Sequence, residues 1–83
     1  MHYEIIFRVP MDQSGYATYM AKKYETSSYN YQFERPNNFS AQQFIFYDIN
    51  SMNQFIKTMV EKLGDNFIIE SIENQTIKEE KKG

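Results

Sequence analysis

The sequence predicts a single α+β domain whose strands and helices follow one another in the order β-α-β-β-α-β. Apolar residues alternate with polar ones in three segments, as in half-buried strands, and recur at helical spacing in two others. The chain has 83 residues, which suits one domain near the small end of what folds without disulfides or metals. We expect residues 1–74 to form this domain and residues 75–83 to be a charged, frayed tail.

The segments 3–9 and 41–48 are the strands with the clearest alternation. Successive side chains of a strand point to opposite faces of the sheet, so one set from each segment should meet the core. The inward sets are Tyr3, Ile5, Phe7 and Val9 in the first segment and Phe44 and Phe46 in the second. The outward sets are Glu4, Ile6 and Arg8 in the first segment and Gln43, Ile45 and Tyr47 in the second.

Two segments have the spacing of amphipathic helices, 13–25 and a second one that ends at Gly64. Asp12 or Ser14 is placed to cap the first helix, and Asn50 or Ser51 the second. Glycine is the common residue just after a helix end. The apolar stripe of the second helix, which we expect to pack whole into the core, is Met52, Phe55, Ile56, Met59, Val60 and Leu63.

The remaining strands are less sharply defined. In the segment 28–34, aromatic residues alternate with polar ones, and the proline and asparagines of the segment 35–38 favour a turn back into the next strand. The segment 66–74 is rich in isoleucine. Both of its alternations contain apolar and polar residues, so its buried face is undecided.

This order of elements is that of the ferredoxin-like plait, a four-stranded antiparallel sheet with two helices on one face. Right-handed crossovers place the strands at 3–9 and 41–48 in the centre of the sheet. Central strands should be apolar on both faces, and Ile6, Ile45 and Tyr47 meet that expectation on the outward faces. The alternative is a strand meander with one helix, if Gly15 keeps the segment 13–25 from becoming helical.

The residues that usually carry chemistry are scarce. The chain has no cysteine and a single histidine, His2, too few ligands for the zinc sites of small domains. Its three glycines, at 15, 64 and 83, form no phosphate-binding loop. We therefore expect a protein that is not an enzyme and uses neither metal nor cofactor.

The charge distribution argues against nucleic acid as the main partner. The formal net charge is −2, and phosphate binding needs a surplus of lysine and arginine. RNA-recognition domains of the RRM type share the predicted fold and stack bases on aromatic residues of the central strands. The segment 41–47 supplies aromatic residues but lacks the basic residue and the glycine of their third-strand motif. An RNA- or DNA-binding domain is thus the alternative function.

The leading hypothesis is a small protein-binding module that acts as an adaptor, regulator or inhibitor. Its partner, or a second copy in a homodimer, would bind the sheet face without helices. The binding residues predicted there are Glu4, Ile6, Arg8, Gln43, Ile45 and Tyr47.

Residue usage gives only a loose indication of origin. Ile, Asn, Lys, Tyr and Phe make up nearly half of the chain, whereas leucine occurs once, a bias typical of AT-rich genomes. An inhibitor of a bacterial host system encoded by a phage or mobile element, of the anti-CRISPR type, is compatible with this bias and with the small size. With no long apolar run and no secretory signal at the N-terminus, the expected location is the cytoplasm, without membrane contact.

Overall fold

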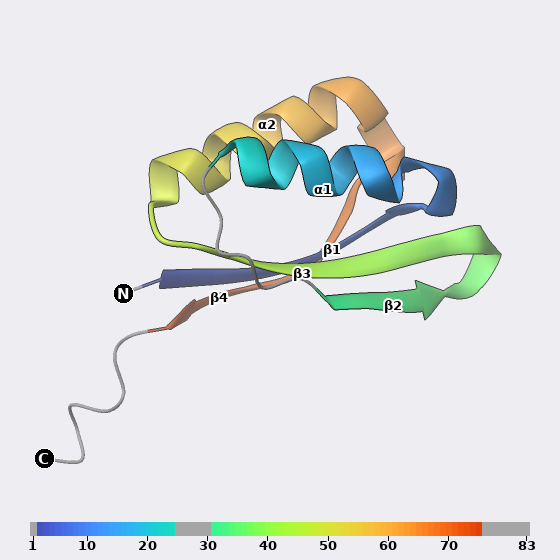
Figure 1. Cartoon of the computed structure of the whole chain (residues 1–83), viewed down its shortest axis with the longest axis horizontal. Helices are drawn as coiled ribbons and strands as arrows, with labels where there is room; N and C mark the ends of the chain where they lie inside the picture. Colours follow the sequence, from blue (N-terminus) through green and yellow to red (C-terminus); the bar gives the residue numbers. More distant parts are fainter. Residues whose placement is uncertain (1, 25–30, 76–83) are drawn as a thin grey trace, which may run out of the picture.

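A computed structural model describes residues 2–24 and 31–75 of the chain and has two layers, a four-stranded sheet and a pair of helices on one of its faces (Figure 1). The sheet is antiparallel, with strand order β2-β3-β1-β4. This is the predicted ferredoxin-like plait, with two crossovers joined by a hairpin. The elements are β1 (His2–Pro10), α1 (Ser14–Lys23), β2 (Tyr31–Arg35), β3 (Phe39–Phe46), α2 (Ile49–Leu63) and β4 (Ile68–Gln75).

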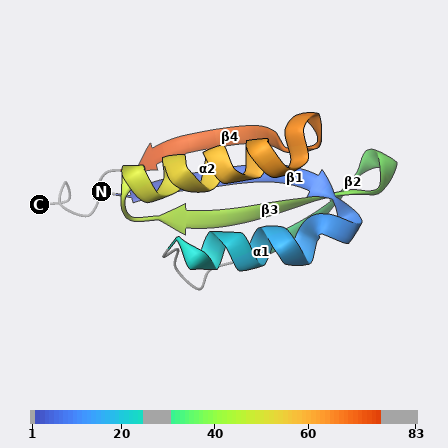
Figure 2. The same ribbon diagram turned by 90° about the horizontal axis from the view of Figure 1, so that it is seen from above.

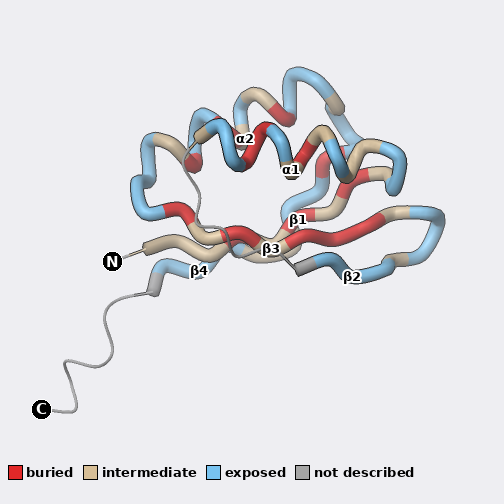
Figure 3. The backbone as a smooth tube through the Cα atoms, in the orientation of Figure 1, coloured by how far each residue is buried: buried red, intermediate tan, exposed pale blue. Residues whose placement is uncertain are grey.

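The two central strands turn their predicted inward residues to the helices. In the antiparallel register of β1 and β3, Ile5 lies opposite Phe44, and both side chains are fully buried. Phe7, Val9 and Phe46 are also fully buried, and Tyr3 packs against the core from its edge. The prediction for these faces is confirmed. Figure 3 shows buried residues along β1 and β3 and exposed ones along β2.

The core is held together by phenylalanine rings around Phe7. Its ring centroid lies 5.2 Å from that of Phe67, 5.4 Å from that of Phe55 and 6.0 Å from that of Phe44. These spacings are those of favourable aromatic pairs. A chain with no cysteine and one leucine thus gains its buried area from large rings contributed by two strands, α2 and the turn before β4.

One polar side chain is buried in the layer between α1 and the sheet. Gln42 of β3 is fully buried, and its amide nitrogen donates a hydrogen bond to the carbonyl oxygen of Ser14 at 2.9 Å. Its amide oxygen accepts one from the hydroxyl of Thr18 at 3.2 Å. A buried amide left without partners would cost stability, so these bonds fix α1 in position over β3.

The ends of the helices differ from the sequence-based prediction. Asp48 caps α2 by accepting a hydrogen bond from the backbone N–H of Ser51 at 3.1 Å, so neither Asn50 nor Ser51 is the cap. Neither Asp12 nor Ser14 caps α1 through its side chain, because a short 3-10 turn, Met11–Gln13, leads directly into the helix. The helix ends at Lys23 with Tyr24 as its C-cap, before the predicted end near residue 25, which lies outside the described residues.

The apolar stripe of α2 is narrower than predicted. Met52, Phe55 and Met59 are buried, and Ile56 and Leu63 are partly buried against the core. Val60 is 49% exposed, so its assignment to the core is wrong. It lies on the flank of the helix, at the margin of the buried face.

The aromatic face of the second strand turns away from the helices. Phe33 lies opposite Ala41, whose side chain points to the face without helices, and Phe33 is 38% exposed. The half-buried strand predicted from the aromatic alternation at 28–34 is therefore present from residue 31 onward, with Phe33 on the open side. Tyr29 lies outside the described residues. The turn after this strand uses Asn37 and Asn38 at φ of 65° and 62°, a conformation that asparagine tolerates well.

A β-bulge explains why the buried face of the last strand could not be predicted. Phe7 lies opposite Ile69, but Ile6 lies opposite Ser71, so Glu70 is an extra residue in β4. Ile69 and Ile72 lie on the helix side of the sheet, whereas Ile68, opposite Arg8, lies on the other. The extra residue shifts the alternation by one and mixes polar and apolar residues in both sets.

We predict that Phe55→Ala lowers the free energy of unfolding by about 3–5 kcal/mol, because it removes a ring that contacts three others and leaves a cavity. Val60→Ala, on the exposed flank of the same helix, should cost less than about 0.5 kcal/mol. Urea denaturation monitored by circular dichroism measures both. Similar losses for the two variants would contradict the assignment of the buried face.

Candidate functional site

The face of the sheet opposite the helices, called the open face here, is the candidate binding surface (Figure 1). β1 and β3 bring five of the six predicted residues together there: Glu4 lies opposite Ile45, and Ile6 lies opposite Gln43, with Arg8 farther along β1. The sixth, Tyr47, follows the last residue of β3.

The predicted residues differ in how accessible they are. Tyr47 is 61% exposed, and its ring meets that of His2 edge-on, with centroids 6.0 Å apart. The other five are only partly exposed. Ile6 and Ile45 therefore offer less apolar surface than the alternation alone suggested, and neighbouring side chains on the open face shield part of them.

Two arginines from different strands converge on one glutamate at the far end of the open face. Arg35, the last residue of β2, donates from Nε and Nη2 to the two carboxylate oxygens of Glu70, each at 2.9 Å. Arg8 places its Nε 3.1 Å from Oε2 of the same carboxylate. Glu70 is the extra residue of the bulge in β4. Because Arg8 belongs to β1 and Arg35 to β2, the cluster links three strands across the open face.

The paired contact with Arg35 controls the ionisation of Glu70. The hydrogen bond from Arg35 holds the pKa of the Glu70 carboxyl below its usual value of 4.5. Burial opposes this effect, and the positive charges of Arg35 and Arg8 add to it. The same hydrogen bond raises the pKa of Arg35. The planar guanidinium matches both carboxylate oxygens at once, a geometry that lysine does not reproduce.

The cluster lies over a small apolar patch. The guanidinium of Arg35 lies over the ring of Phe33, 5.6 Å from its centroid. Ala41 is fully buried although it belongs to the open face, where its neighbours across the strands are Phe33 and Arg8. Long side chains thus cover the centre of this end of the sheet and hold the charged groups in fixed positions.

The opposite end of the open face carries carboxylates. Glu4 of β1 lies directly opposite Glu73 of β4, and the side-chain amide of Gln43 donates a hydrogen bond to Glu4. The open face is therefore polarised along the strands, with Arg8 and Arg35 toward the β2–β3 turn and Glu4 and Glu73 toward the start of β1 and the end of β4.

Sequence reasoning missed Phe33, Arg35, Ile68 and Glu70 as members of this surface. Phe33 and Arg35 share a face by alternation, but only the pairing of Phe33 with Ala41 shows that this is the open face. Glu70 reaches the open face only because of the bulge. The pairing of Arg35 with Glu70, 35 residues apart in the chain, has no local sequence signal.

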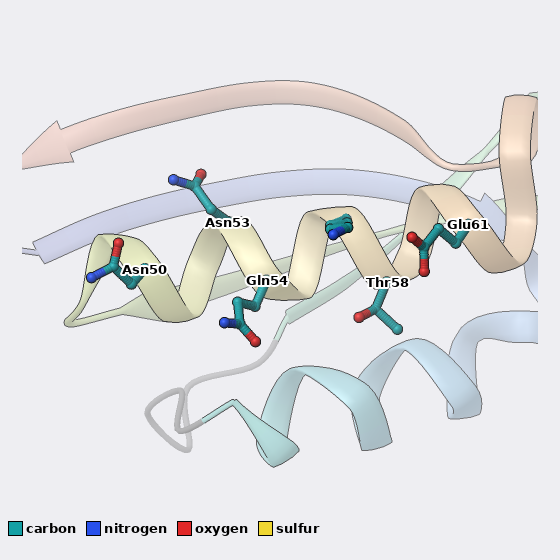
Figure 4. Close-up of a pocket in the computed structure, with 6 residues that line it drawn as sticks. Asn50, Asn53, Gln54, Thr58 and Glu61 are labelled. Carbon is teal, nitrogen blue, oxygen red and sulfur yellow. The ribbon is translucent and has the colours of Figure 1, made fainter.

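Polar side chains also gather on the outer surface of α2. A shallow depression on α2 is lined by Asn50, Asn53, Gln54, Lys57, Thr58 and Glu61. Figure 4 shows Asn53 pointing toward β4 and Thr58 toward α1, so these groups diverge. Within residues 2–24 and 31–75, no three His, Asp or Glu side chains gather as a metal site requires, and no helix is long and apolar enough to cross a membrane.

Comparison with known protein families, with curated proteins and with solved structures found no match to this chain. The ferredoxin-like plait supports many unrelated activities, so the fold alone does not indicate a function. The function has to be argued from the groups that the surface presents.

We predict that Glu70→Gln lowers the free energy of unfolding at neutral pH, because the amide keeps the shape but loses the charge that both arginines contact. The pKa of Glu70 is lower in the folded than in the unfolded chain, so its stabilisation is complete well above pH 4.5 and is lost as the pH falls through the folded value. The difference between wild type and variant should therefore shrink in acid. Urea titrations at a series of pH values measure it, and a gap that stays constant into strong acid would contradict the assignment.

Proposed function

We propose that this chain is a non-enzymatic protein-binding module whose partner binds the open face of the sheet. The observation that carries the proposal is the cluster of Arg8, Arg35 and Glu70, held in place over Phe33 and Ala41. Arginine and aromatic side chains dominate the energetics of protein interfaces. Groups already fixed in the free protein lose little conformational entropy on binding.

The polarity of the open face indicates the chemistry of the partner. The carboxylates of Glu4 and Glu73, directly opposite each other, suit a lysine or arginine of a partner. Arg8 is 35% exposed in its side chain and shares the carboxylate of Glu70 with Arg35. It suits an acidic side chain or a backbone carbonyl. Tyr47 and Phe33 supply exposed aromatic surface at opposite ends of the face.

A nucleic-acid partner, the alternative, fits the open face less well. The charged residues that the register places on it are Arg8, Arg35, Glu4, Glu70 and Glu73, two positive and three negative. Binding to phosphates depends on a surplus of positive charge, which this face lacks. Arg35 is moreover engaged by Glu70 through two hydrogen bonds.

As biological context we propose an adaptor, regulator or inhibitor in the cytoplasm. An inhibitor of a bacterial host system, of the anti-CRISPR type and encoded by a phage or mobile element, is the specific form of this hypothesis. It is supported by the small size and the residue bias of the chain. It predicts a partner that is itself a bacterial defence or regulatory protein.

A matched pair of tyrosines tests the binding surface. Tyr47 lies at the open face and is 61% exposed, whereas Tyr19 lies on α1 and is 65% exposed. We predict that Tyr47→Ser lowers capture of a protein partner from nuclease-treated lysate of the source cell at least about tenfold. Tyr19→Ser should leave capture unchanged. Quantitative mass spectrometry of the captured protein measures both, and equal capture by the two variants would overturn the proposed surface.

We further predict weak or no binding to random single-stranded RNA at physiological salt, measured by fluorescence anisotropy. The physical reason is the small number of cations on the open face. A sub-micromolar affinity that falls steeply with added salt would favour the alternative function instead.

A further inference from the structure

The helix layer leaves one edge of the sheet uncovered. Seen from above, α2 lies along β1 while β4 runs beside it as an edge strand (Figure 2). Ile69 and Ile72 of β4 face the helix side of the sheet, yet they are 38% and 44% exposed. The described helices therefore cover these two side chains only in part.

The flank of α2 nearest to β4 carries two exposed apolar side chains beside one polar residue, Asn53. Thr58 lies on the opposite flank, where its hydroxyl is 3.2 Å from that of Tyr24, next to α1. Asn53 points toward β4 (Figure 4), and helical spacing places Ile49 and Val60 on the same side. Ile49 is 44% and Val60 49% exposed. We call Ile49, Val60, Ile69 and Ile72 the edge patch.

The edge patch stands out against the rest of the described surface. Nine large apolar side chains are exposed in the described residues, and four of them belong to the helix side of β4 or to the α2 flank that faces it. None of the described strands lies beside the outer side of β4, so its backbone groups are available for pairing over up to eight residues. An exposed strand edge beside a row of isoleucines and a helix flank offers both hydrogen bonds and apolar area.

A charged residue on an edge strand usually blocks such pairing. Here Glu70, at the bulge, turns to the open face, where Arg8 and Arg35 neutralise its carboxylate. The carboxylate of Glu70 therefore lies over the open face and not beside the unpaired edge of β4. Glu73, opposite Glu4, also turns to the open face, so the helix side of β4 carries Ile69, Ile72 and Asn74 and no charge.

The edge patch is complementary to itself. A two-fold axis through Ile72 sets antiparallel copies of β4 with Ile72 opposite its own copy and Ser71 opposite Glu73. An axis between Glu70 and Ser71 sets Ile69 opposite Ile72. Neither register sets one glutamate directly opposite another, and like charges in that position would be destabilising. Both bring the α2 flanks of the two copies to the same side of the joined sheet, as an isologous interface requires.

We propose that two copies of this chain associate through β4 and the adjacent flank of α2, which forms a continuous eight-stranded sheet and buries the edge patch. The open face remains accessible in such a dimer, because the strands join at their edges. The dimer would therefore present two open faces on one side of a single sheet. This inference does not depend on the function proposed for the open face.

Sedimentation velocity of the full chain, from low to high micromolar concentration, tests the proposal. Wild type should pass from the mass of one chain to that of two, with slower hydrogen exchange of β4 amides at the higher concentrations. Val60→Asp and Ile72→Asp each place a charge in the interface, so each should raise the dissociation constant of the dimer at least about tenfold. Tyr19→Asp, with the same charge change on α1, should leave it unchanged.

Val60→Asp lies on an exposed helix position and keeps the test valid if Ile72→Asp disturbs the strand. A wild type that remains a single chain at the highest concentration would overturn the proposal. So would a dimer that Val60→Asp leaves intact. If Tyr47→Ser dissociates the dimer and Val60→Asp does not, self-association uses the open face, and the edge-patch proposal fails while the binding role of the open face stands.

Discussion

The contact of Phe7 with the rings of Phe44, Phe55 and Phe67 is the interaction on which the rest of the structure depends. Phe7 joins the two central strands, α2 and the turn before β4 in one cluster, and the chain has no disulfide to share that task. Because strand side chains alternate, fixing Phe7 toward the helices fixes Ile6 and Arg8 toward the other face. The core and the open face are thus two consequences of one constraint.

Ion pairs and hydrogen bonds position the side chains of the open face, whereas contacts between phenylalanine rings position those of the core. A single bulge residue, Glu70, lets two arginines from separate strands meet one carboxylate over the buried Ala41. The same bulge turns the charge of Glu70 away from the outer edge of β4. One inserted residue therefore shapes two surfaces: it gives the open face a fixed charged cluster and leaves the edge patch apolar.

The strand faces of β1 and β3 and the buried side of α2 could be predicted because each depends on local periodicity. The predictions that failed depend on information outside the local pattern. Val60 lies at the margin of a helical stripe whose width is set by where α2 meets the sheet. Phe33 looks like a core residue until its pairing with Ala41 fixes its face. Arg35 and Glu70 are brought together only by the tertiary fold. The sequence therefore predicted three polar binding residues, Glu4, Arg8 and Gln43, but not the ion cluster that Arg8 forms with Arg35 and Glu70.

The sheet has one buried and one accessible face, and cysteine labelling tests this arrangement most directly, since the chain has no cysteine of its own. Ile45→Cys, partly exposed on the open face, should react with a thiol reagent under native conditions, whereas Val9→Cys, fully buried on the helix face, should react only after unfolding. Addition of a bound protein partner should then protect position 45. Equal reactivity at the two positions in the folded chain would contradict the account.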